Sequence, residues 1–246
     1  RSNLCMGRVY GLPQESGSRE SMSGLVSNPM DKPEASKVTL FGIADYAWNI
    51  NGFKSDEAWK EGIVRLYPQA AEAMQAFVDH NSDQGPNGHG YRREESVNIA
   101  PVVTLVLEAA REGRVVKSDT ALLKKEFSRM AAAAPVIREK VDNPRLMKEI
   151  GAWVDAFEQL GMAGQHAVAA LENSSPKAAV TALVKATQAL AAMDRISREH
   201  NQQGQLYRSA VKTGSRVMTP AVNELADIVS RKTFPSLSGT PALSPR

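Results

Sequence analysis

Hydrophobic positions recur at helical spacing through most of the chain after Pro33. Two stretches show this most clearly, because their apolar residues alternate steps of four and three, as in a helix that buries one stripe against a neighbour. The two stretches are Leu123, Phe127, Met130, Ala134, Ile137 and Val141, and then Leu146, Ile150, Trp153, Phe157, Leu160, Gly164, Val168 and Leu171. We therefore predict two long helices that pack along these seams, with Trp153 and Phe157 in the buried face.

The remaining pattern is also helical, so the sequence predicts a mainly α chain organised as a helical bundle. A third long amphipathic helix is expected after Pro176, with its apolar side formed by Val180, Leu183, Val184, Leu190 and Ala191. The expected helices cover residues 34–49, 55–66, 68–80, 97–112, 119–141, 144–172, 176–200 and 215–232.

Cap residues and prolines mark several of these boundaries. Asn143-Pro144 and Ser175-Pro176 each place a cap residue before a proline at the first helical position. Ser55 precedes two carboxylates and is predicted to be an N-cap. Pro68 and Pro220 are expected in the first turns of their helices.

The sequence near the two ends of the chain lacks the helical pattern of its middle. Residues 11–24 are rich in Gly, Ser and Glu and are predicted to be a flexible loop, and the tail after Phe234 is linker-like. The chain begins at Arg1, without an initiator Met or a signal peptide, which we interpret as a processed or truncated product. No run of 18 or more apolar residues occurs, so no membrane span is expected.

Composition and charge are those of an ordinary soluble protein, with 42% hydrophobic and 23% charged residues. The net charge of +3 is small, and basic pairs such as Lys124-Lys125 are short and followed by Glu, so nucleic acid is not an expected partner. Cys5 is the single cysteine and is predicted to be a buried small hydrophobe.

The segment around residues 79–96 raises the question of a metal. Asp79, Asn81 and Asp83 alternate as in a calcium loop, but Gln84 and Gly90 stand where that loop needs Gly and Glu. A turn-rich loop after a helix explains the same residues. We therefore predict neither calcium nor any cofactor.

His80 and His89 lack a third ligand at a spacing that would suit zinc. Hydrogen bonds from these histidines to local backbone are the favoured interpretation. The following Arg92-Arg93-Glu94-Glu95 is consistent with an ion-paired hinge and equally with an arginine that binds a carboxylate. Glu94-Glu95, beside a helix start, is expected to have a structural role.

Several runs in the first hundred residues resemble one enzyme family. They are Ser27-Asn28-Pro29-Met30, Asp45-Tyr46-Ala47-Trp48-Asn49, His80-Asn81-Ser82-Asp83 and the run from Gly85 to Ser96. In this order and spacing they resemble the bacterial β-N-acetylglucosaminidases of glycoside hydrolase family eighty-four, the O-GlcNAcase and hyaluronidase-like enzymes. The similarity is looser from about residue 100 to Lys232.

The resemblance implies a (β/α)8 barrel followed by a helical domain, with the body of the barrel outside this chain. Residues 1–33 would be the end of the barrel and an active-site loop, 34–233 the helical bundle domain, and 234–246 a linker-like tail. Such enzymes act by substrate-assisted catalysis with two adjacent aspartates. This chain has no Asp-Asp pair, so we expect no catalytic residue in it and no activity from it alone.

The resemblance also implies partners and one site residue. The partners would be N-acetylglucosaminyl glycoconjugates and the upstream catalytic barrel. Asn28 corresponds to a family residue that hydrogen-bonds sugar hydroxyls, although before a proline it could instead only set a turn. Relatives are mostly exported, so a secreted or periplasmic location is expected. The alternative function is a freestanding helical interaction domain without catalysis.

Overall fold

The fold, taken from a computed structural model, is described for residues 3–10, 24–85, 94–202 and 210–234. These residues form helices and no extended sheet, and the mainly α fold predicted from the sequence is confirmed. The helices are α2 (Pro33–Trp48), α3 (Ser55–Leu66), α4 (Ala71–Asp79), α5 (Ala100–Arg111), α6 (Lys117–Lys140), α7 (Pro144–Glu172), α8 (Pro176–Gln202) and α9 (Met218–Thr233). The predicted loop at 11–24, except Gly24, and the tail after Phe234 lie outside the described residues.

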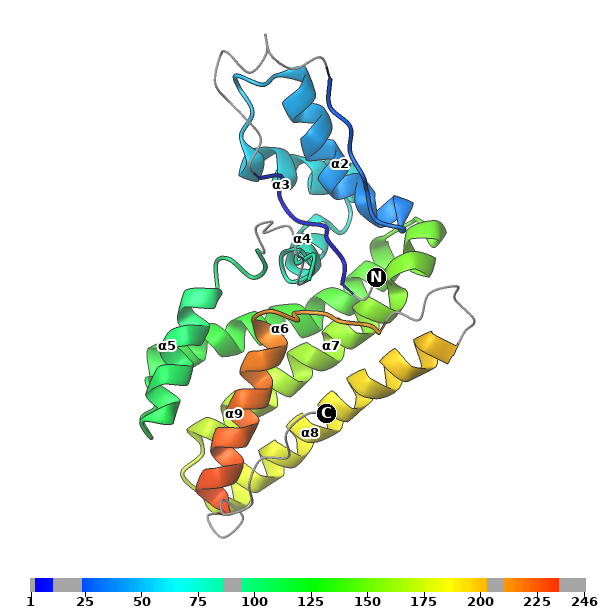
Figure 1. The fold of residues 1–246 in the computed structure, drawn as a ribbon. Coiled ribbons are helices and arrows are strands. Elements are labelled where there is room, and N and C mark those ends of the chain that lie inside the picture. Colours follow the sequence, from blue (N-terminus) through cyan, green and yellow to red (C-terminus); the bar gives the residue numbers. More distant parts are fainter. Residues whose placement is uncertain (1–2, 11–23, 86–93, 203–209, 235–246) are drawn as a thin grey trace.

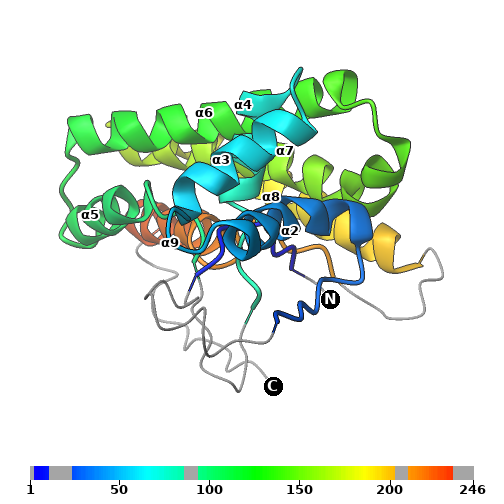
Figure 2. The same ribbon diagram turned by 90° about the horizontal axis from the view of Figure 1, so that it is seen from above.

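The helix α7 is the centre of the bundle. It packs mainly against α8 and α6, and it also contacts α9 and α2. Figures 1 and 2 both show α6 running beside α7. The helices α2 and α3 pack together at one end of the molecule (Figure 1). The extended segment 3–10 enters the molecule between this end and the bundle (Figure 1). None of the described helices combines the length and the hydropathy of a membrane-spanning segment.

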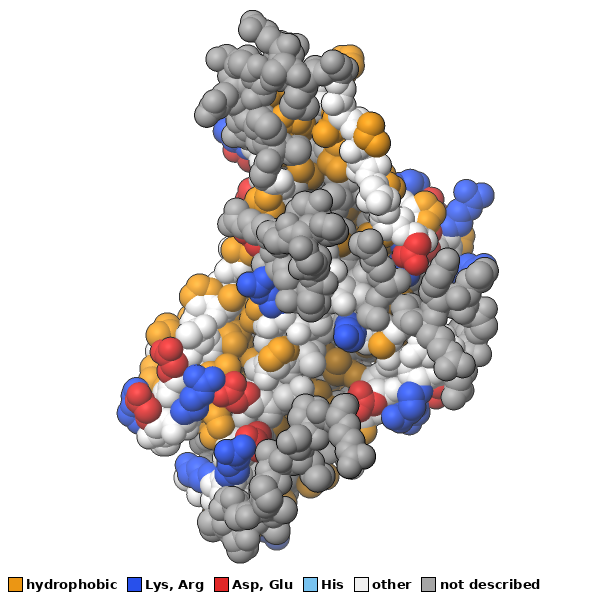
Figure 3. Space-filling view, in the orientation of Figure 1, with side chains coloured by type: hydrophobic (Ala, Val, Ile, Leu, Met, Phe, Trp, Pro, Cys, Tyr) orange, Lys and Arg blue, Asp and Glu red, His pale blue; other side chains and the backbone are white. Residues whose placement is uncertain are grey.

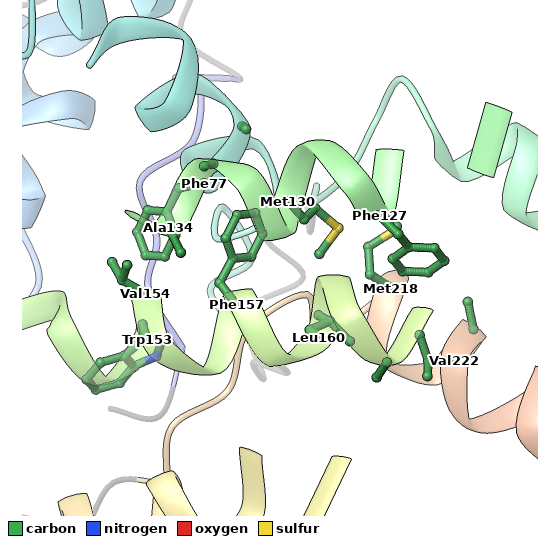
Figure 4. Packing of buried hydrophobic residues seen from close by; sticks show 14 of the residues in the cluster. Phe77, Phe127, Met130, Ala134, Trp153, Val154, Phe157, Leu160, Met218 and Val222 are labelled. Carbon is green, nitrogen blue, oxygen red and sulfur yellow. The ribbon is translucent and has the colours of Figure 1, made fainter. Parts of the chain in front are cut away.

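The two predicted seams are confirmed as the core of the bundle. Every residue named for them is buried, and Trp153 and Phe157 are fully enclosed. Phe157 meets Phe77 of α4 edge to face, with ring centroids 5.4 Å apart, whereas Trp153 meets His200 of α8 at 5.0 Å. Figure 4 shows Phe157 between Phe77 and Met130. The seam of α7 therefore joins three other helices rather than one.

The third long helix exists as predicted, but its buried face differs from the expected one. The buried apolar residues of α8 are the alanines 179, 186 and 189, while Val184 is 50% exposed. Small side chains allow α8 to lie close to α7, and the larger Val and Leu residues flank that contact. The prediction from hydropathy placed these larger residues in the buried face, which the alanines form instead.

Of three local predictions at helix starts, two are wrong or shifted and one is confirmed. Ser55 is the first residue of α3 and not its N-cap, because its hydroxyl donates to the carbonyl of Val9 at 2.5 Å. The helix α4 begins at Ala71, since Pro68 lies in a turn closed by the amide of Ala70 and the carbonyl of Tyr67. The cap at Asn143 is confirmed, with its side chain accepting from the amide of Leu146 at 3.0 Å.

Candidate functional site

The extended segment 3–10 is held by side chains of two helices and by the backbone of the loop after α4. The amide of Met6 donates to the carbonyl of Asn81 at 3.1 Å, and the indole of Trp59 donates to the carbonyl of Met6 at 3.1 Å. The hydroxyl of Thr39 lies within hydrogen-bond distance of two further carbonyls of the segment. An extended backbone that would otherwise need a sheet is thus satisfied by polar side chains from α2 and α3 and by the loop after α4.

Asn28 lies on a second irregular segment, residues 24–32, beside the first. The two segments meet where the amide of Cys5 donates to the sulfur of Met30 at 3.1 Å, and Met30 packs against the main core. Asn28 itself is exposed, and its side chain makes no hydrogen bond to the described residues. A turn-setting role would normally use the side chain locally. The amide of Asn28 is instead available to a group outside this chain, and sugar contact stays a prediction.

Arg8, within segment 3–10, is held by two carboxylates and by an aromatic ring. Its guanidinium lies 2.7 Å from the carboxylate of Asp56 and 3.4 Å from that of Asp79, and its Cζ sits 3.9 Å from the centre of the Trp59 ring. Burial lowers the pKa of Arg8, but the hydrogen bond to Asp56 and the charge of Asp79 outweigh this effect and raise it. Arg8 therefore stays charged and joins the segment to α3 and α4.

A cavity of about 220 Å³ opens beside Arg8. Cys5, Ser82 and Glu94 are among its lining residues. Cys5 is partly exposed there, so the prediction of a buried cysteine is wrong. Its thiol lies 3.8 Å from the carbonyl of Ser82, and the cavity leaves one side of the residue uncovered.

The calcium-like residues do not converge. The carboxylate of Asp79 is paired with Arg8, and the side chain of Asn81 donates to the carbonyl of Phe77 at 2.8 Å. Asp83 is buried. Within the described ranges no three His, Cys, Asp or Glu side chains are placed to hold a metal ion.

His80 is buried completely, but its partners differ from the local backbone predicted for it. Its Nδ1 lies 2.7 Å from the hydroxyl of Ser96, and its Nε2 lies 2.8 Å from a carboxylate oxygen of Glu126 in α6. Burial raises the pKa of Glu126, yet the hydrogen bonds from His80 and Arg129 prevail and lower it to about 2. His89 and the arginine pair at 92–93 lie outside the described residues.

Glu95 has a structural role, as expected, but at the start of a distant helix and not at the helix that follows it in the sequence. Its carboxylate accepts from the amides of Arg216 and Val217, at 3.0 and 3.1 Å, just before α9 begins. Burial raises the pKa of Glu95 to about 7, against the opposing effect of these hydrogen bonds, and the charge of Asp83 adds to the increase. The loop after α4 therefore anchors α9 as well as the N-terminal segment.

Comparisons with known proteins match both halves of this arrangement. Residues 95–226 match the post-catalytic domain of bacterial glycoside hydrolase family 84, and residues 1–79 match β-N-acetylglucosaminidase. The match to β-N-acetylglucosaminidase ends at the last residue of α4, and the match to the post-catalytic domain begins at residue 95, in the loop that follows. The domain boundary predicted at residue 33 stays a prediction.

Solved structures show the same fold. The structure of CpGH84D is 27% identical with a TM-score of 0.78, and the match covers 93% of this chain and 38% of that one. CpGH84B is 20% identical with a TM-score of 0.78, covering 91% and 37%. A mutant of the Thermobaculum terrenum O-GlcNAc hydrolase is 20% identical with a TM-score of 0.64, covering 99% and 49%. This chain thus spans less than half the length of each. With one family model matching more than half of its residues, the chain belongs to glycoside hydrolase family 84.

Proposed function

We propose that this chain is the C-terminal part of a retaining β-N-acetylglucosaminidase of the O-GlcNAcase type. The observation that carries the proposal is a pair of matches that follow each other along the chain, first to β-N-acetylglucosaminidase and then to a post-catalytic domain. The chain also spans less than half the length of its structural neighbours. The catalytic barrel would precede residue 1 and pack on the helical domain. Its substrates would be N-acetylglucosaminyl glycoconjugates.

The proposed reaction is substrate-assisted. The acetamide oxygen of the sugar attacks the anomeric carbon, one carboxylate orients the acetamide, and a protonated group gives its proton to the leaving oxygen. The family uses two adjacent aspartates for these tasks, and no two aspartates are adjacent in this sequence. We therefore assign no catalytic residue to this chain.

The contribution of this chain to the site would be Asn28. An amide offers one acceptor and two donors, which suits sugar hydroxyls that both donate and accept. Two features support the assignment: Asn28 is exposed without a partner among the described residues, and the adjoining Met30 is fixed to Cys5 and to the core. Asn28 is thus held at the surface two residues from the partly buried Met30.

Hydrolysis of an aryl β-N-acetylglucosaminide tests the proposal. The 246-residue chain should release no aryl alcohol, whereas the same chain extended upstream through a complete barrel should release it. Hydrolysis by the shorter chain would show that the catalytic groups lie within it. An inactive, folded longer protein would instead favour a freestanding helical interaction domain.

We also propose a secreted or periplasmic location, since an enzyme for glycans of the host or the environment must reach them. Fractionation of cells that express the full-length gene product checks this. Recovery of an uncleaved product in the cytosolic fraction would contradict it.

A further inference from the structure

A hollow of about 460 Å³ lies between the C-terminal half of α8, the loop at residues 210–217 and Asn3. In Figure 1 the loop is the orange coil that leads to the start of α9. The volume falls within the roughly 300–1,000 Å³ of small-molecule sites. Asn28 is not among the lining residues. We propose that this hollow is a second binding site, and that its ligand is an uncharged sugar residue.

The loop that forms one wall is anchored at three points. Lys212 forms a parallel bridge with Asn3, and the amide of Gly214 donates to the carbonyl of His80 at 3.0 Å. Glu95 accepts from the two amides that follow at the start of α9. Gly214 has φ +53°, and a side chain there would meet Leu160, so this path requires glycine. The wall is therefore preorganised, which reduces the entropy lost when a ligand binds.

Four hydroxyl groups line the hollow, and the existing contacts of two of them leave a hydrogen to donate; the Thr219 hydroxyl already donates to the carbonyl of Thr213. The hydroxyl oxygen of Ser197 accepts from the amide of Val211 at 3.0 Å, and that of Ser215 accepts from Asn3 at 2.6 Å. A hydroxyl that accepts in this way still has a hydrogen to donate. The Thr213 hydroxyl is buried, with no partner among the described residues, and a buried polar group in that state is costly. This hydroxyl oxygen has essentially no exposed surface, so the hydroxyl donors available to a ligand are those of Ser197 and Ser215.

Charge in the hollow favours a neutral ligand. The lining includes one carboxylate, Asp194, and one ammonium group, Lys212, so its net formal charge is zero. Both side chains are exposed, the carboxylate able to accept from sugar hydroxyls and the ammonium able to donate to them. Met193 and Val211 add an apolar side, against which the C–H face of a sugar ring can pack. Hydroxyl donors, a carboxylate acceptor and an apolar wall together match a sugar better than an ion or a purely apolar molecule.

The test is a titration of the ¹⁵N-labelled 246-residue chain with N-acetylglucosamine, followed by amide chemical shifts. We expect saturable shifts at residues 193–197 and 210–219. Asp194→Ala should weaken binding about fivefold or more, because it removes the carboxylate acceptor. Glu199→Ala is the matched control, since it removes an exposed carboxylate from the same helix outside the hollow and should leave the affinity within about twofold.

Ser215→Ala, which removes a hydroxyl whose hydrogen can be donated to the ligand, should also weaken binding, with Ser128→Ala on the exposed side of α6 as its control. Absence of saturable shifts at the hollow, or equal effects of Asp194→Ala and Glu199→Ala, would overturn the inference. Shifts confined to residues 24–30 and abolished by Asn28→Ala would overturn it too, while supporting the proposed role of Asn28. The hydrolysis assay of the full-length enzyme tests the proposed function independently of these outcomes.

Discussion

Gly161 of α7 lies directly against the backbone of Ala131 in α6. A Cβ atom added at Gly161 would stand 2.5 Å from the amide nitrogen of Ala131 and 2.7 Å from the carbonyl oxygen of Phe127. Both obstacles are backbone, so neither can rotate away as a flexible side chain would. Gly164, one turn further along α7, faces the ring of Phe127 in the same way. The two helices can approach this closely only because α7 lacks side chains at these positions.

Gly161→Ala is therefore expected to destabilise the fold by about 1–3 kcal/mol, the usual cost of overpacking. Gly151→Ala on the same helix is the matched control, because a Cβ there meets nothing within 4 Å. The control should gain roughly 0.5–1 kcal/mol from the better helix propensity of alanine. Urea unfolding of both variants measures the difference, and a similar change of sign and size at the two positions would contradict the close contact.

Phe157→Ala should lower the free energy of unfolding by about 3–5 kcal/mol. The ring is fully buried between α7, α4 and α6, and its loss leaves a cavity lined by Phe77 and His80. Trp153→Ala, which removes the contact with His200, should cost a similar amount. Met162→Ala, at a position 38% exposed on the same helix, should cost much less. Equal thermal stability of the Phe157 variant and the parent would show that the ring is not packed as described.

The seams of α6 and α7 could be predicted from sequence because large apolar residues at helical spacing have few other uses in a chain of this composition. The face of α8 could not, since alanine is compatible with both a buried close contact and an exposed surface. Hydrophobic residues also lie on the surface: Figure 3 shows hydrophobic and charged side chains interspersed on one face of the molecule. Val26 is 96% exposed and Trp48 90% exposed, although both are hydrophobic.

The long-range contacts of the loop after α4 could not be predicted from the sequence either. Its pattern of Asp, His and Glu residues indicated a polar loop, and sequence reasoning assigned it local contacts. In the structure His80 reaches Glu126, and Glu95 reaches the start of α9, 121 residues away at Arg216. Which distant backbone amides a buried carboxylate will meet depends on how the helices are arranged, and no spacing within the loop encodes it.

Glu95 makes the stability of the fold depend on pH. Its pKa is raised from 4.5 to about 7 in the folded state. Between these values the folded protein holds a proton that the unfolded chain has lost, so this group lowers the free energy of unfolding as pH rises through that window. Glu95→Gln keeps an oxygen that accepts from Arg216 and Val217 and removes the charge. The variant should thus gain stability relative to the parent, by up to roughly 3 kcal/mol at about 1.4 kcal/mol per pKa unit.

Urea unfolding of the Glu95→Gln variant and the parent at about pH 5 and about pH 8 measures this effect, and the other titrating groups cancel in the comparison. The advantage of the variant should be small at the lower pH and larger at the higher one. An advantage that does not change with pH would mean that the carboxylate is already ionised in the folded protein across this range.

Asn28→Ala in the full-length enzyme should reduce kcat/KM for an aryl β-N-acetylglucosaminide roughly tenfold or more, a loss of about 1.4 kcal/mol of transition-state stabilisation. The proposed cause is the removal of hydrogen bonds between the Asn28 amide and sugar hydroxyls. Folding should be unaffected, because Asn28 is exposed and makes no side-chain hydrogen bond to the described residues. Asn223→Ala provides the control, since Asn223 is an exposed asparagine on α9. Unchanged kcat/KM in the Asn28 variant would remove Asn28 from the sugar site, whereas a loss of activity with a lowered melting temperature would assign the residue to the turn before Pro29.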